Sequence, residues 1–214
     1  VLNTLFNYNT DVVWVYRGEV IDISSKAAFN KCLSVICDQV YCDTPVYINE
    51  MVNKHKPSSA ISTARVNFLA HLLDNGAEEN LGFEDGKFPP EKTIYLTLLR
   101  NTGIYRRMGR EYLLGEPRVE SFMPLWNVCE AFLDSTKEKP RKLGELIKIL
   151  RSRPFKLKQG VIDLWLPTFL IIKKNDYSLY NDAGVYIHTI TREVLDIMQK
   201  SPAGFSVKAF NVDG

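Results

Sequence analysis

The fold of this chain is indicated most clearly by Leu143–His188, which contains LGELIKILR (Leu143–Arg151), GVIDLWLPTFLII (Gly160–Ile172) and YSLYNDAGVYIH (Tyr177–His188). The first two strings carry apolar residues at helical spacing. The third holds two β-prone runs separated by Asn, Asp and Gly, which are turn residues. Helix, helix and two-stranded hairpin is the element order of a winged-helix-like unit. We therefore predict such a unit in the C-terminal part of the chain.

The rest of the sequence predicts helices with a few short strands. Asp11–Ile23 is rich in Val, Trp, Tyr and Ile around Arg17-Gly18, which predicts a β-hairpin. Apolar stripes and capping residues predict further helices over 25–41, 44–52, 58–72, 89–101, 121–135 and 191–200, and a last strand over 205–212. The expected fold class is α+β and mainly α, a helical bundle with short β-hairpins.

A domain boundary is predicted within Thr136–Pro140, where a polar, proline-containing stretch separates the upstream helices from the winged-helix-like unit. This gives a domain over residues 1–136, made of a β-hairpin and helices, and a winged-helix-like domain over residues 137–214. The irregular stretch Ile104–Pro117 contains Arg106, Arg107 and Arg110 and has no predicted element.

Composition permits a real core but does not select a function. The chain has 214 residues, of which 45% are hydrophobic, so it can bury a core as one large or two small domains. Its 27 basic and 25 acidic residues leave a net charge of +2, which creates no overall basic field of the kind that attracts nucleic acid. Local charged patches are still compatible with this balance.

A cytoplasmic protein is expected from the cysteines and from the apolar segments. Four cysteines are too few for a disulfide scaffold at this length, which favours reduced thiols. The apolar stretch Val161–Ile172 is interrupted by Asp163 and Pro167 and is shorter than the roughly 20 residues of a membrane span. It predicts a core helix, and no membrane partner is expected. No secretory leader pattern opens the chain.

Nucleotide and metal motifs fail on spacing. The segment Gly82–Phe88 approaches a P-loop but is one residue short, ends in Phe instead of Ser or Thr, and carries two carboxylates that repel phosphate. Cys32, Cys37 and Cys42 recur every five residues, so on a helix each is rotated by about 140° from the last and they cannot share one zinc ion. We predict that these thiols are small buried residues of a core helix.

No catalytic centre is predicted. The only histidines are His55, His71 and His188, and none stands in a nucleophile motif or a triad context. The acidic pairs at 78–79 and 84–85 lie in an aperiodic, glycine-containing stretch that is typical of a solvated loop. We expect no catalytic residue, no cofactor and no metal site, and hence no enzyme.

The strongest charge asymmetry lies in Lys137–Lys158, where nine basic residues face Glu138 and Glu145, a local excess of seven. Because Lys and Arg contact phosphates, this run is a candidate nucleic-acid interface, although a solvated face or a docking surface for a partner chain would look the same. Arg106, Arg107 and Arg110 extend it only if the fold places them alongside. The candidate residues are Lys142, Lys148, Arg151, Arg153, Lys156 and Lys158.

Four strings together resemble one protein family: YCDTPVYINE at 41–50, Ala64-Arg65, FPPE at 88–91 and PFKLKQGVI at 154–162. They are similar to the segment C-terminal to the P-loop core of large bacterial phage-defence (BREX-type) ATPases and related DUF proteins, over roughly residues 14–205. The resemblance implies an accessory segment whose ATPase motor lies elsewhere in a parent chain. It offers no catalytic residue to transfer.

The sequence thus favours an interaction module of a larger bacterial ATPase in phage defence. Its expected partners are double-stranded DNA, met through the basic patch, and other domains of a parent P-loop ATPase. The alternative is a purely structural or oligomerisation domain that makes contact through exposed apolar patches instead of charges.

Overall fold

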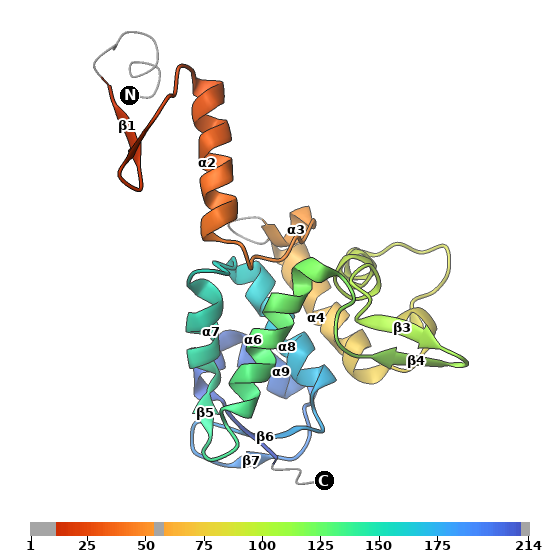
Figure 1. Ribbon diagram of the computed structural model, residues 1–214. Coiled ribbons are helices and arrows are strands. Elements are labelled where there is room, and N and C mark those ends of the chain that lie inside the picture. The colour runs from red at the N-terminus through yellow and green to blue at the C-terminus, as the bar shows by residue number, and fades with distance from the viewer. Residues whose placement is uncertain (1–11, 54–57, 211–214) are drawn as a thin grey trace. The chain divides into compact units, whose positions relative to one another are not determined.

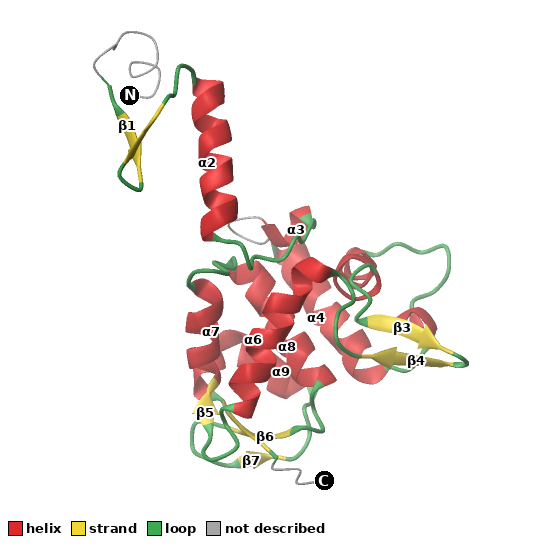
Figure 2. Ribbon diagram, viewed as in Figure 1, coloured by secondary structure: helices red, strands yellow, loops and turns green. Residues whose placement is uncertain are grey.

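The computed structural model of the chain describes residues 12–53 and 58–210. The chain divides into two compact units, Val1–Cys42 and Asp43–Gly214. Helices dominate and the strands are short and antiparallel, so the predicted α+β, mainly α class is confirmed (Figure 2). His55 and the two ends of the chain lie outside the described residues, and so do Asp11 of the predicted hairpin and Val212 of the predicted last strand.

The first unit contains the predicted hairpin and one helix. Strands β1 (Trp14–Tyr16) and β2 (Glu19–Ile21) pair around Arg17-Gly18, which both adopt positive φ values of 54° and 86°. A two-residue turn of that type matches the twist of the flanking strands. Helix α2 (Lys26–Val40) follows, and the hydroxyl of Ser25 caps it by accepting from Ala28 N at 3.1 Å.

The predicted burial of Cys32 and Cys37 in α2, and of Cys42 just beyond its end, is wrong. Cys32 is half-buried, and Cys37 and Cys42 are exposed. Within α2, which is described along its whole length, no residue is fully buried. The apolar stripe correctly predicted the helix, but periodicity alone does not show what a stripe packs against.

A predicted helix start at Thr44-Pro45 is also wrong. The hydroxyl of Thr44 donates to the backbone oxygen of Phe155 instead of capping a helix, and the following residues are irregular. The helix in this region is the short α3 (Glu50–Asn53), at whose start Asn49 Oδ1 accepts from Met51 N at 3.1 Å. A distant contact of the cap side chain has therefore overridden its local preference.

The next two helices agree with their sequence patterns. Helix α4 (Ser59–Asp74) is capped by Ser58 and buries Phe68, Leu69 and Leu72 from its predicted stripe. A 3-10 turn, η1 (Glu79–Gly82), lies in the acidic loop. Helix α5 (Pro90–Tyr95) continues into a π-helical turn, η2 (Leu96–Arg100), and packs against α4.

The stretch 104–117 contains a hairpin that the sequence reading missed. Strands β3 (Tyr105–Met108) and β4 (Glu111–Leu114) pair through a two-residue turn at Gly109-Arg110, with Gly109 at φ 64°. Glycine at the first turn position is typical of a tight hairpin, and this was the signal that the sequence offered.

The remaining helices and the last three strands follow the prediction, whereas the strand at 141–142 and the 3-10 turn at 202–204 were not predicted. A 3-10 turn, η3 (Glu120–Phe122), leads into α6 (Met123–Asp134), which has Pro124 in its first turn. Strand β5 (Arg141–Lys142), α7 (Leu143–Arg151) and α8 (Gln159–Ile172) come next. The chain then forms β6 (Tyr177–Tyr180), β7 (Tyr186–Ile187), α9 (Arg192–Lys200), η4 (Pro202–Gly204) and β8 (Ser206–Ala209).

Four of these strands form one antiparallel sheet in the order β5-β8-β6-β7. It lies at one end of the helices of the second unit, below α6 and α7 in Figure 1. Strand β8, the last in the chain, is inserted between β5 and β6. Strands β6 and β7 form the predicted hairpin, with its turn at residues 181–184.

Helix α8 is the centre of the core, as its apolar sequence predicted. Every residue from Val161 to Ile171 except Asp163 is buried. The indole of Trp165 lies 5.9 Å from the ring of Phe122 and 6.4 Å from that of Trp126. Among the helices of the described ranges, none is long and apolar enough to cross a membrane.

The predicted domain boundary between residues 136 and 137 falls inside the second unit. Thr136 is buried there, and its hydroxyl oxygen accepts from Ala209 N at 2.7 Å. Helix α6 packs against both α7 and β8. Because this core runs across the predicted linker, residues 137–214 are not a separate compact unit.

Candidate nucleic-acid interface

Five of the six candidate cations gather where α7 ends and α8 begins. Lys148 and Arg151 lie in the last turn of α7, one helical turn apart, and Arg153, Lys156 and Lys158 follow in the connecting loop. All five side chains are exposed. We refer to this group as the basic ridge: Lys148, Arg151, Arg153, Lys156 and Lys158.

Lys142 does not belong to the ridge. It precedes the first residue of α7, so the nine-residue helix places it about 13 Å from Arg151 at 1.5 Å per residue. Its ammonium group pairs with Asp182 of the β6–β7 turn at 3.2 Å. The sixth candidate is therefore at the opposite end of α7.

Backbone hydrogen bonds fix the shape of the loop between α7 and α8, and its apolar and basic residues have different roles. Leu157 N donates to Leu150 O at 2.9 Å, and Lys156 N donates to Ser152 O at 2.8 Å. Phe155 and Leu157 are buried, whereas Lys156 and Lys158 between and after them are exposed. The apolar residues thus anchor the loop, and this alternation directs the charges to solvent.

A polar network joins the ridge to α4. The guanidinium group of Arg151 donates to Gln159 Oε1, and the amide group of Gln159 donates to Asp163. Asp163 Oδ2 accepts from Arg65 Nη1 of α4 at 2.5 Å. Sequence reasoning assigned no role to Arg65, although a cation within an apolar helical stripe indicates a buried partner.

The ridge carries uncompensated charge. Lys142, Arg141 and Lys173 each pair with a carboxylate, but among the described residues no ion pair includes a ridge cation. The pKa of Glu145 is lowered, mainly by its hydrogen bond from Arg141, and the charge of Lys148 adds to this effect. Cations at the end of α7 also offset the negative end of its dipole, which is a purely structural use of the same charges.

The start of α8 adds a second feature to this surface. No described side chain caps its N-terminus at Lys158; Val161 N donates to Lys158 O at 3.0 Å, and the amides of Gln159 and Gly160 have no capping side chain. Such amides together with the helix dipole favour an anion. Anion contact at this end of α8 is therefore chemically consistent with the cations around it.

Arg106, Arg107 and Arg110 do not extend the ridge. They lie on the β3–β4 hairpin, which Figure 1 shows on the other side of α6 and α8 from α7. Arg106 Nη1 donates to the backbone oxygens of Gly103 at 3.0 Å and Glu116 at 2.9 Å. The role of Arg106 visible in the structure is to hold the base of its own hairpin.

The glycine-rich loop near Gly82 is organised by a buried lysine. Lys92 is only 6% exposed, and its ammonium group donates to the backbone oxygens of Glu84 at 2.8 Å and Lys87 at 2.9 Å. The carboxylates at 78, 79, 84 and 85 are exposed, in agreement with the predicted solvated loop. The ammonium group of Lys92 thus holds the backbone of this loop, whereas the lysine of a P-loop contacts phosphate.

The described histidines have different surroundings. His71 Nδ1 lies 3.0 Å from Leu81 O, and its ring stacks on Phe83 at 4.1 Å. His188 is exposed beside Tyr186, at 4.5 Å between ring centroids. Within the part of the chain that the structure describes, no three His, Cys, Asp or Glu side chains are grouped closely enough to hold a metal ion.

Cys129 is a buried thiol of the core. Trp165 Nε1 donates to its sulfur at 3.3 Å, and burial raises the pKa of this thiol to about 12. The side chain therefore stays protonated at neutral pH and packs as a small apolar group.

The comparisons with known proteins identify no relative: no family model, curated protein or solved structure matches the chain. The resemblance to phage-defence ATPases accordingly stays a prediction from the sequence.

Proposed function

We propose that this chain is a non-catalytic interaction module of a larger bacterial ATPase in phage defence, and that it contacts double-stranded DNA through the basic ridge. The observation that carries the DNA contact is the gathering of five exposed cations, none of them ion-paired among the described residues. Lys and Arg supply the phosphate contacts that dominate affinity for DNA. The link to phage defence rests on the sequence resemblance.

The ridge is suited to backbone contact more than to reading bases. Its cations are held on a loop whose shape is fixed by the bonds from Leu157 to Leu150 and from Lys156 to Ser152. A preorganised set of charges loses little conformational entropy when it meets phosphates. We therefore expect binding that depends strongly on salt and weakly on sequence.

A winged-helix-like arrangement of α7, α8 and the β6–β7 hairpin is part of the proposal. The order of these elements supports it. Because α8 is buried along Val161–Ile171, its flank cannot enter a DNA groove. The proposal therefore assigns the contact to the loop before α8 and the first residues of α8.

The parent protein supplies the other partners in this proposal. Its P-loop ATPase domains would bind the nucleotide, and the present module would couple them to DNA. We place the module in the cytoplasm, where a reduced thiol such as that of Cys129 persists.

The decisive experiment measures binding of the whole chain to a fluorescent DNA duplex between about 50 and about 200 mM salt. We expect the logarithm of the binding constant to fall linearly with the logarithm of the salt concentration. Arg151→Glu combined with Arg153→Glu should weaken binding by roughly tenfold or more and reduce the salt slope by about 2, because each lost phosphate contact removes about one unit.

A second double variant has the same change in net charge as the ridge variant and serves as its control. Lys31→Glu combined with Lys139→Glu changes the charge equally at two exposed sites outside the ridge. Its binding should stay within about threefold of the wild type, because neither residue is one of the ridge cations that make the proposed phosphate contacts. Absent binding, salt-insensitive binding or equal losses in the two variants would reject the DNA contact.

A structural or oligomerisation role is the second candidate, and the first unit favours it. Val15 and Val20 face each other across β1 and β2 and are 60% and 73% exposed, and Val13, just before β1, is 66% exposed. Contiguous exposed apolar groups are typical of contact surfaces. If they hold copies together, sedimentation should give an oligomer that Val15→Glu converts to a monomer. A monomeric wild type would reject this role.

A further inference from the structure

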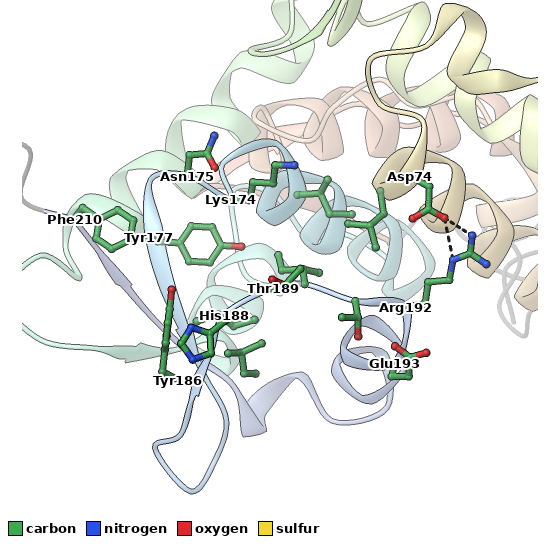
Figure 3. Close-up of a pocket in the computed structure, with 16 residues that line it drawn as sticks. Asp74, Lys174, Asn175, Tyr177, Tyr186, His188, Thr189, Arg192, Glu193 and Phe210 are labelled. Atoms are coloured by element: carbon green, nitrogen blue, oxygen red, sulfur yellow. Dashed lines mark hydrogen bonds and ion pairs between the residues drawn. The ribbon is translucent and has the colours of Figure 1, made fainter.

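A cavity of about 810 Å³ lies at the C-terminal end of α8, where no sequence pattern indicated a site (Figure 3). Its walls come from the ends of α4 and α8, from β6, and from the segment between β7 and α9. In the view of Figure 3, Tyr177 lies at one end of the cavity with Tyr186, His188 and Phe210, and Asp74 with Arg192 lies at the other. This size is typical of ligand sites.

The cavity exists because the β6–β7 hairpin opens. The two strands pair at Leu179 with Ile187 and at Tyr180 with Tyr186, and Asn181 N donates to Val185 O at 3.0 Å. Pairing then stops, because His188 and Thr189 form a bend instead of continuing the strand. The chain between β7 and α9 therefore diverges from β6 along the cavity.

The opening leaves one residue of β6 without a partner on β7. In an antiparallel sheet, alternate residues of a strand direct both N–H and C=O to the same neighbour. Phe210 N donates to Asp176 O on the β8 side, so the odd-numbered residues of β6 face β7. Leu179 meets Ile187 in this way. Tyr177 is the next odd-numbered residue and faces the cavity.

Tyr177 is therefore a buried residue whose backbone N–H and C=O face the cavity without a partner on β7. It is only 4% exposed, and its hydroxyl group is satisfied by donating to Leu170 O at 2.9 Å. The β6–β7 ladder ends at the pair Leu179 and Ile187, so no residue of β7 takes the N–H or C=O of Tyr177. Buried backbone groups are nearly always paired, so a group that enters the cavity should supply both partners.

The charged side chains that line the cavity indicate the charge of the group that would bind there. Asp74 accepts from Arg192 Nε at 3.1 Å, and Glu193 lies in the first turn of α9, where the helix dipole offsets its charge. Lys174 also lines the cavity and is exposed, and no ion pair of the described chain includes it. An acidic group is the natural complement of this free ammonium group.

We propose that this cavity is a docking groove for an extended peptide segment of a partner protein that carries an acidic side chain. One peptide residue pairs with the N–H and C=O of Tyr177 and so continues the interrupted pairing of β6. An extended peptide matches this donor and acceptor, because each alternate residue of a β-strand presents one N–H and one C=O to the same neighbouring strand. The acidic side chain pairs with Lys174, and apolar neighbours pack on Leu179 and Ile187.

The test selects peptides from a displayed library of short random sequences on the folded chain of 214 residues. We expect enriched peptides to contain Asp or Glu flanked by β-prone residues, and to lose binding when the amide nitrogen that pairs with the groove is methylated. In the complex, the amide proton of Tyr177 should exchange more slowly with solvent than in the free chain.

Three variants localise the contact. Thr189→Trp places a large ring on an exposed wall residue and should abolish binding by filling the groove. Lys174→Glu should weaken binding by about tenfold through charge repulsion. Lys139→Glu makes the same charge change at an exposed site that does not line the cavity, and should leave affinity unchanged.

Several outcomes would overturn the groove. Enrichment of the same peptides on Thr189→Trp would place their contact elsewhere, and failure to enrich any peptide would remove the proposal. A concentration-dependent dimer that Thr189→Trp disrupts would make a second copy of the chain the occupant. Binding of DNA that is weakened by Lys174→Glu but not by the ridge variant would make nucleic acid the occupant.

Discussion

The two ends of α8 present opposite kinds of surface. At the N-terminal end, the basic ridge is a set of exposed cations on a loop fixed by short-range bonds such as Lys156 to Ser152. At the C-terminal end, the groove is hollow, partly aromatic and lined by segments as far apart as Leu73 and Phe210. One buried helix thus positions a site built from neighbours in sequence and another built from distant ones.

The largest effect is expected from a substitution in the middle of α8, the helix that both surfaces share. Trp165 is completely buried in the middle of α8, so Trp165→Ala should lower the free energy of unfolding by about 3–5 kcal/mol, through lost burial and the cavity it leaves. Urea denaturation of the whole chain measures this. Tyr186→Ala, at an exposed groove residue, should cost less than about 1 kcal/mol. Equal costs would contradict the central role of α8.

A smaller loss of stability is expected from a substitution at the ridge end of α8. A Cβ atom at Gly160 would lie 2.5 Å from the backbone oxygen of Val52, so Gly160→Ala forces α3 and α8 apart. We expect a loss of about 1–3 kcal/mol, as for overpacked cores, without a change in peptide binding at the groove. Gly204→Ala is the control, because its added Cβ meets only ordinary contacts at 3.6 Å and 3.8 Å. Denaturant midpoints of both variants decide the point.

The smallest effect is on the pH dependence of stability. It compares a carboxyl group in α7, next to the ridge, with one in α9, next to the groove. The pKa of Glu145 in α7 is lowered mainly by Arg141, and that of Glu193 in α9 mainly by the hydroxyl group of Thr191. A carboxyl group with a lowered folded pKa stabilises the fold above its unfolded value of 4.5, and this contribution is lost as pH falls below that value.

Melting temperatures measured from neutral pH downward should therefore fall below pH 4.5, and less steeply in Glu145→Gln and in Glu193→Gln. Added salt should reduce the contribution of Glu145 more than that of Glu193, because an exposed ion pair is screened and a neutral hydroxyl donor is not. Equal salt sensitivity would show that charge, not the hydroxyl group, controls Glu193.

The contrast between the two ends also explains what the sequence could predict. Helices α7 and α8, the β6–β7 turn and the ridge cations are encoded over a few neighbouring residues, so periodicity, turn residues and charge counts found them. Lys142 was grouped with the ridge because it is near in sequence, whereas the length of α7 separates it in space.

The errors arose where a distant contact decided the outcome. Thr44 looked like a helix cap, but its hydroxyl group donates to Phe155. The predicted linker at 136–140 lies inside the second unit, where the distant residues Thr136 and Ala209 share a hydrogen bond. The groove depends on a break in strand pairing at Tyr177, which no local sequence pattern indicates. The β3–β4 hairpin differs, since Gly109 did offer a local signal that was overlooked.

The bond between Arg192 and Asp74 has a consequence for the order in which the molecule takes shape. It joins residues 118 positions apart, and Phe210 completes the same wall. During ribosomal synthesis the ridge loop can close as soon as its own residues emerge, whereas the groove must wait for nearly the whole second unit. A surface assembled last in this way would be exposed to partners only on chains whose folding is complete.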